Sequence, residues 1–142
     1  MFLGTFDHSL DTKGRVILPA RFREQLEGGA VVTQGLDGCL TIHTTEEFEE
    51  LAASMQEKAR RGSVERQAVR AFFAGAAEVE LDGQGRISLP QHLRSFAGLR
   101  QKVVVIGAHD HIELWDPKQW DGVSGRGNQS LATAQPGLDD LL

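Results

Sequence analysis

Three absences narrow what this chain of 142 residues can be. Cys39 is its single cysteine, so the chain lacks an intrachain disulfide and the Cys-x-x-Cys pairs that bind zinc, which is typical of a reducing compartment. No run of about 18 apolar residues occurs, so we expect no membrane-spanning helix. The first nine residues lack a basic start and an apolar core, so we expect no signal peptide and a cytoplasmic protein.

An excess of positive charge is also missing. The net charge is −5, so the molecule as a whole does not match nucleic acid, and any DNA-binding site must be a local patch. The sequence contains no phosphate-binding loop and no dinucleotide-binding glycine pattern. Apolar residues (40%) and charged residues (25%) are present in ordinary globular proportion.

One ten-residue stretch occurs twice. Residues 10–19 read LDTKGRVILP, and residues 81–90 read LDGQGRISLP. The similarity extends to both sides, at a shift of 71 residues that becomes 72 after one insertion. A match of this length at a nearly fixed period indicates duplicated structure. Because a unit of about 50 residues is only marginally stable alone, we expect the two copies to share one core.

Each copy predicts four strands and a short helix. The expected strands are 6–10, 15–18, 30–34 and 39–43 in the first copy and 77–81, 86–89, 102–106 and 111–115 in the second, with helices at 20–26 and 91–97. The Asp-x-x-Gly-Arg sequence predicts a tight turn, in which Gly14 and Gly85 supply positive φ. Capping boxes begin at Thr44 and Asp116, which are equivalent positions of the two copies.

The duplication divides the chain into four parts. We expect a first unit at 2–48, a helical connector at 49–72, a second unit at 73–121 and a flexible tail at 122–142. The connector predicts two helices broken at 60–62, the second capped by Ser63 and buried along Val64, Ala68, Ala71 and Phe72. The tail is rich in Gly, Ser, Gln and Asn, which favours mobility, and only its acidic and apolar end, 138–142, suits docking on a partner.

The first copy carries the only concentrated basic segment. Its cations are Lys13, Arg15, Arg21 and Arg23. An arginine on a tight hairpin matches phosphate, or the O6 and N7 atoms of guanine, through two parallel hydrogen bonds. Alternatively, Asp11 and Arg15 only pair across the turn and weakly stabilise it. The second copy offers Arg86 and Arg94, but Gln84 replaces the lysine.

The pattern Asp-x-Lys-Gly-Arg-Val-x-Leu-Pro at 11–19 resembles the signature of the AbrB/SpoVT swapped-hairpin DNA-binding unit. Two such units with a helical insert resemble the MraZ family of transcriptional regulators over about residues 1–121. The resemblance implies a mainly β fold with short helices, in which two AbrB-like swapped-hairpin repeats form one intertwined β-barrel. It also implies a bacterial regulator that is located with the nucleoid and assembles into rings.

The resemblance further implies a partner and a site. Family members bind short direct repeats of double-stranded DNA in the promoter of the cell-division and cell-wall gene cluster, usually as repressors. We therefore expect DNA binding by Lys13, Arg15, Arg86, Arg21 and Arg23, with Asp11 and Asp82 orienting their arginines. Because Gln84 departs from the pattern, the first copy should contribute more. A ring presents many copies of the turn, so avidity can offset the acidic total.

Other functions have weaker support. His109 and His111 are spaced to suit a metal, but they fall where the first copy has a plain hairpin turn, and the sequence offers no third ligand nearby. Cys39 begins an alternating strand, which favours a packed side chain over a nucleophile. We therefore expect no enzyme, no cofactor and no metal. The alternative is a ring-forming scaffold or an antitoxin-like module whose tail binds another protein.

Overall fold

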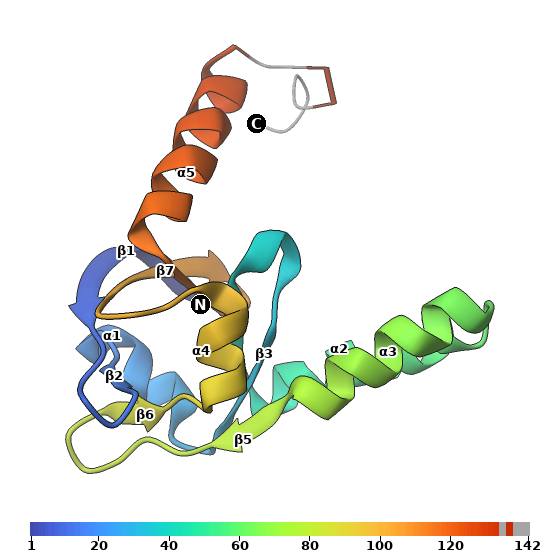
Figure 1. Cartoon of the computed structure of the whole chain (residues 1–142), viewed down its shortest axis with the longest axis horizontal. Coiled ribbons are helices and arrows are strands. Elements are labelled where there is room, and N and C mark those ends of the chain that lie inside the picture. The colour runs from blue at the N-terminus through green and yellow to red at the C-terminus, as the bar shows by residue number, and fades with distance from the viewer. Residues whose placement is uncertain (134–135, 138–142) are drawn as a thin grey trace.

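The computed structural model describes residues 1–133 and 136–137, and it is mainly β. A six-stranded antiparallel sheet has the order β1-β7-β8-β4-β3-β5, and a second sheet pairs β2 with β6 (Figure 1). The strands are β1 (Phe2–Ser9), β2 (Arg15–Ile17), β3 (Ala30–Gln34), β4 (Leu40–Thr44), β5 (Ala77–Val79), β6 (Arg86–Ser88), β7 (Lys102–His109) and β8 (Ile112–Trp115). All eight predicted strands are confirmed, although β1 begins four residues early. The larger sheet is open, with β1 and β5 at its edges, so these pairings do not close a barrel.

Short helices connect and flank the strands. They are α1 (Ala20–Arg23), which continues as the 3-10 turn η1 (Glu24–Leu26), then η2 (Leu36–Gly38), α2 (Thr45–Ala59), α3 (Ser63–Gly75), α4 (Gln91–Ala97) and α5 (Pro117–Ala132). Both predicted N-caps are confirmed, because the Thr44 and Asp116 side chains accept backbone N–H groups three residues later. Ser63 does not cap α3; Gly62 takes that position. Among the described residues, no helix is both long and apolar enough to cross a membrane.

The two units exchange strands. β1 of the first unit pairs with β7 of the second over its whole length. In return, β5 of the second unit pairs with β3 of the first. β2 and β6 form an antiparallel ribbon, the β2–β6 ribbon, in which Val16 lies opposite Ile87. Each unit therefore completes its pairing only with strands of the other.

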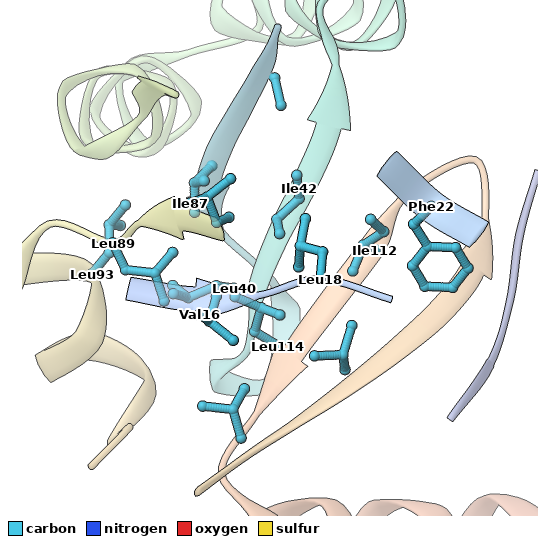
Figure 2. Close-up of a cluster of buried hydrophobic side chains, with 14 of the residues drawn as sticks. Val16, Leu18, Phe22, Leu40, Ile42, Ile87, Leu89, Leu93, Ile112 and Leu114 are labelled. Carbon is cyan, nitrogen blue, oxygen red and sulfur yellow. The ribbon is translucent and has the colours of Figure 1, made fainter. Parts of the chain in front are cut away.

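A shared core lies between the β2–β6 ribbon and the larger sheet. Figure 2 shows ribbon and sheet side chains packed together: Val16, Leu18, Ile87 and Leu89 with Leu40, Ile42, Ile112 and Leu114. All eight are buried. Phe22 extends the core. Its ring packs edge-on against the Phe2 ring, with 5.2 Å between the two ring centres. Burial stabilises by roughly 1.5–3 kcal/mol for each large side chain, so the ribbon is firmly held and the predicted shared core is confirmed.

The α2–α3 hairpin projects from the body (Figure 1). Apolar residues at three-to-four spacing form the half-buried face of α2: Phe48, Leu51, Ala52, Met55 and Ala59. The predicted buried side of α3 is confirmed only at Phe72, which is half-buried; it was wrong for Val64, Ala68 and Ala71, which are exposed, while Val69 is buried instead. α3 meets α2 through Phe72 and Phe73, which lie 6.3 and 6.1 Å from the Phe48 ring. The hairpin contacts the sheet mainly at β3 and β4, so its covered faces are those turned toward each other and toward these strands.

Helix α5 occupies much of the region for which composition predicted an irregular tail. Asp116 caps it and Pro117 is its first residue, so its start is well specified. Its anchor is Trp120, whose ring lies 5.6 Å from that of Trp115. The segment from Gly122 that the sequence predicts as a flexible tail is thus helical as far as Ala132, despite its glycine content. The predicted docking end, 138–142, lies outside the described residues.

Candidate nucleic-acid interface

The loop after β1, residues 11–15, is here named the first turn. Asp11 organises it: Oδ1 accepts the backbone N–H groups of Lys13 and Arg15, each at 2.9 Å. Its Oδ2 accepts the Nε–H group of Arg15 at 2.6 Å. Gly14 has φ +75°, which an L side chain rarely adopts. One carboxylate thus fixes both the backbone of the turn and the direction of the guanidinium.

Residues 82–86, the second turn, repeat this arrangement. Asp82 Oδ1 accepts the N–H groups of Gln84 and Arg86, each at 2.9 Å, and its Oδ2 accepts Arg86 Nε–H at 2.7 Å. Gly85 has φ +78°. The predicted tight turn with glycine at positive φ is confirmed in both copies.

Both aspartates are ionised at neutral pH. The backbone hydrogen bond from Arg86, and after it the bond from its guanidinium, lowers the pKa of Asp82 to about 2. The corresponding bonds from Arg15 lower the pKa of Asp11. Each pair is accessible to solvent, so it adds little to stability and chiefly sets direction. Within the described part of the chain, the terminal nitrogens of Arg15 and Arg86 have no hydrogen-bond partner.

The β2–β6 ribbon places the two turns in a fixed relation. Arg15 lies opposite Ser88, and Ile17 lies opposite Arg86. Since side chains alternate between the faces of a strand, Arg15 and Arg86 share the face turned away from buried Val16. They are diagonal neighbours, so their Cα atoms are about 7–8 Å apart. The ribbon therefore presents two oriented arginines on one surface.

The remaining predicted cations lie beside this surface. Lys13 is exposed in the first turn. Arg21 is exposed on α1, with its guanidinium 5.5 Å from the centre of the Phe6 ring. Arg23 is only half exposed, because its Nε–H group donates to the carbonyl of Leu18 at 2.9 Å. Two further residues, Ile17 and Ser88, lie on the arginine face. They were not among the predicted site residues, although the alternation of side chains along a strand indicated their position.

The two histidines next to β8, His109 and His111, lie in different surroundings. His111 is held between two carboxylates, since its Nδ1 lies 2.6 Å from Asp110 Oδ1 and its Nε2 lies 3.0 Å from Glu113 Oε2. The hydrogen bond to Glu113, with that to Asp110, raises the pKa of His111. His109 occupies the hairpin with φ +74°. No group of three His, Cys, Asp or Glu side chains among the described residues is placed to hold a metal.

Cys39 is packed under α5. Its Sγ donates to the carbonyl of Leu36 at 3.3 Å, and burial raises the pKa of the thiol to about 12. A thiol held protonated at neutral pH is a poor nucleophile, in agreement with the packed side chain that the strand pattern predicted.

Comparisons with known proteins identify relatives over almost the whole chain. The family model described as "MraZ protein, putative antitoxin-like" matches residues 1–71 and again 72–137. A protein of Acetivibrio thermocellus named transcriptional regulator MraZ is 47% identical over 130 residues, covering 92% of this chain and 91% of that protein. The solution structure of PHS018 from Pyrococcus horikoshii covers 80% of this chain and 88% of its own, at 17% identity and a TM-score of 0.33. That value is too low to support a structural inference.

Proposed function

This chain belongs to the MraZ family, and on that basis we propose that it is a transcriptional regulator that binds double-stranded DNA through the arginine face of the β2–β6 ribbon. The observation that carries the proposal is the pair of oriented arginines on that face. Each Nε is committed to an aspartate, which leaves the terminal N–H groups directed outward. Such a group can donate two parallel hydrogen bonds to a guanine edge or a phosphate.

The dimensions of the ribbon suit the major groove of DNA. That groove admits a two-stranded β-ribbon. DNA rises about 3.4 Å per base pair, so the spacing of about 7–8 Å between the two backbone positions that carry the arginines corresponds to roughly two base-pair steps. Arg15 and Arg86 thereby reach neighbouring positions of one site. Asp11 and Asp82 carry negative charge and act by orienting the arginines rather than by meeting the DNA.

The other cations serve the backbone of the DNA. Lys13 and Arg21 are exposed and suit phosphate oxygens. Arg23 keeps its terminal nitrogens for the same purpose while its Nε–H binds the Leu18 carbonyl. These contacts make binding salt-dependent and set the position of the protein without reading sequence. They also explain how a chain of net charge −5 approaches DNA through one local patch.

We extend the proposal to the assembly and the target. The strand exchange supports one intertwined unit of swapped hairpins as the unit of assembly, in which the β2–β6 ribbon packs on the open sheet. Copies of it form a ring that binds short direct repeats in the promoter of the cell-division and cell-wall gene cluster, as a repressor located with the nucleoid. A ring multiplies a weak single contact, because each further turn binds at a high effective concentration.

Replacement of Arg15 by alanine tests the proposal. We expect R15A to abolish operator binding in a gel-shift assay while the fold and the oligomeric state stay unchanged. Arg60 is a matched control, because it also pairs with a carboxylate, Glu57, at 2.9 Å but lies far from the ribbon on the α2–α3 hairpin. R60A should bind normally. Unchanged binding by R15A would sink the assignment of the site.

The family description also names an antitoxin-like protein, which makes a protein-binding module the second candidate. Nuclease treatment separates the two. In a pull-down from cell extract, an association carried by DNA is lost after nuclease, whereas a direct protein partner survives.

A further inference from the structure

Arg23 and Arg94 cross between the two units. Arg94 lies on α4 of the second unit, yet its guanidinium covers Gly14 of the first turn: a Cβ added there would lie 2.7 Å from Arg94 Cζ. Arg23 covers Gly85 of the second turn in the same way, and a Cβ there would overlap its side chain. Both glycines are buried although their turns face solvent. Each turn is therefore backed by an arginine from the opposite copy.

Hydrogen bonds connect each arginine to the turn that it covers. Arg94 Nε–H donates to the carbonyl of Leu89 at 3.0 Å, and the N–H of Leu89 donates to the carbonyl of Gly14 at 3.0 Å. Leu89 is thus held at one end by the arginine and at the other by the first turn. Leu89 is also buried, so packing holds its side chain while the two hydrogen bonds hold its backbone.

An equivalent series of hydrogen bonds connects Arg23 of the first unit to the second turn. Arg23 Nε–H donates to the Leu18 carbonyl at 2.9 Å, and the Leu18 N–H donates to the carbonyl of Gly85 at 3.0 Å. Gly14 immediately precedes Arg15, and Gly85 immediately precedes Arg86. A displacement of either glycine therefore re-aims the arginine that follows it.

We propose that Arg94 and Arg23 are positioning residues, each setting the direction of the DNA-binding arginine of the opposite copy. This inference rests on the proposed DNA-binding function of Arg15 and Arg86. It gives the second unit a specific task, because Arg94 aims the more basic first turn. It also assigns Arg23 two tasks, the aiming of Arg86 and the phosphate contact proposed above, whereas Arg94 has only the first. Arg94 is thus the cleaner residue to test.

Lysine is the informative substitution. It keeps the positive charge but lacks the planar guanidinium group and its Nε–H donor. It therefore cannot donate a hydrogen bond to the leucine carbonyl and cover the glycine at the same time. R94K should therefore alter the amide and side-chain Nε–H resonances of Arg15, in the other unit, more than those of Arg86. R23K should give the opposite pattern. A purely structural weakening would disturb both turns alike, and this result, or shifts confined to the substituted residue's own unit, would overturn the proposal.

Titration with operator DNA completes the test. We expect R94K to lower affinity roughly tenfold, the size of coupling typical of residues in one network, with the slope of log affinity against log salt unchanged. Crossed shifts without a loss of affinity would overturn the positioning role. A reduced slope in R94A that R94K restores, together with full affinity in R94K, would make Arg94 a phosphate contact instead. Failure of the unsubstituted chain to bind the operator would count against the proposed function, whereas the crossed resonance pattern is measured without DNA.

Discussion

The first and second turns have nearly the same geometry but different charge. Their Asp–Arg distances are 2.6 and 2.7 Å, and their glycines have φ values of +75° and +78°. They differ at the exposed tip, where the first turn has Lys13 and the second has Gln84. The residues that shape the turn are identical in the two copies, whereas those that meet the solvent have diverged. Similar shape with unequal charge supports the proposal that the two turns contribute unequally to DNA binding.

The largest expected effect separates the two arginines. R15A should abolish operator binding, because a loss of about 10- to 100-fold per site, the range for losing a charged hydrogen-bonding group, multiplies over the copies in a ring, while R86A should cost several-fold. Arg15 is expected to matter more because Lys13 beside it draws the first turn closer to phosphate. Fluorescence anisotropy with a labelled operator measures both. An equal or larger loss in R86A would show that the turns are equivalent in function.

Glycine substitutions test whether the turns share one shape. G14A and G85A should each destabilise the protein by roughly 1–3 kcal/mol, since each forces an L side chain to positive φ and toward an arginine. Gly83 is a control within the second turn, because nothing lies within 4 Å of a Cβ added there. Urea denaturation gives the free energies of unfolding. The shared shape is contradicted if G14A costs no more than G83A.

Exchanging the two tip residues should transfer the charge asymmetry. In Q84K the second turn gains a phosphate contact, so the slope of log affinity against log salt should steepen by about 0.9 for each bound subunit. In K13Q the slope should become shallower by the same amount. The double exchange should restore the original slope. A slope that ignores both single substitutions would place these residues away from the DNA backbone.

The smallest effect concerns pH. A carboxyl group whose pKa is lowered by folding stabilises the protein at pH values above its unfolded-state pKa of 3.8. This stabilisation is lost as the pH falls through the folded-state pKa, which is about 2 for Asp82. Asp11 is lowered in the same direction. Both pairs should therefore stay intact between pH 7 and pH 5, and neither aspartate should alter DNA affinity there. Carboxyl carbon shifts followed by NMR report the titration, and a midpoint above 3.8 for either group would be incompatible with these hydrogen bonds.

The sequence predicted the features that depend on local chemistry. Gly14 and Gly85 mark turns because few other residues adopt positive φ, and Thr44 and Asp116 mark helix starts because their side chains accept free backbone N–H groups. These signals lie within a few residues of the feature they specify. Because the sequence repeats, a feature predicted in one copy could also be predicted at the equivalent position of the other.

Features that depend on distant partners were less accessible. The buried side of α3 was misread at Val64, Ala68 and Ala71, because this side is set by distant partners, such as the contact of Phe73 with Phe48 on α2, rather than by the spacing within α3. The start of helix α5 was predicted from its cap, but its extent beyond Gly122 was not. The packing of Trp120 on Trp115 offsets the low helix propensity of the three glycines of α5 only once β8 is in place. The arginine crossing was hidden as well, since the repeat shows Arg23 and Arg94 as equivalents without showing that each reaches the other copy.

Strand exchange has a consequence for how the chain is made. During synthesis the first unit leaves the ribosome before the second exists, so β1 must wait for β7, and β3 for β5. Contacts between residues as far apart as Phe2 and His109 close large loops, which slows folding. Until then the nascent chain carries unpaired strand edges of the kind that aggregate. Two separately expressed halves, split in the connector between α2 and α3, should remain incompletely folded alone and recover the native sheet when mixed.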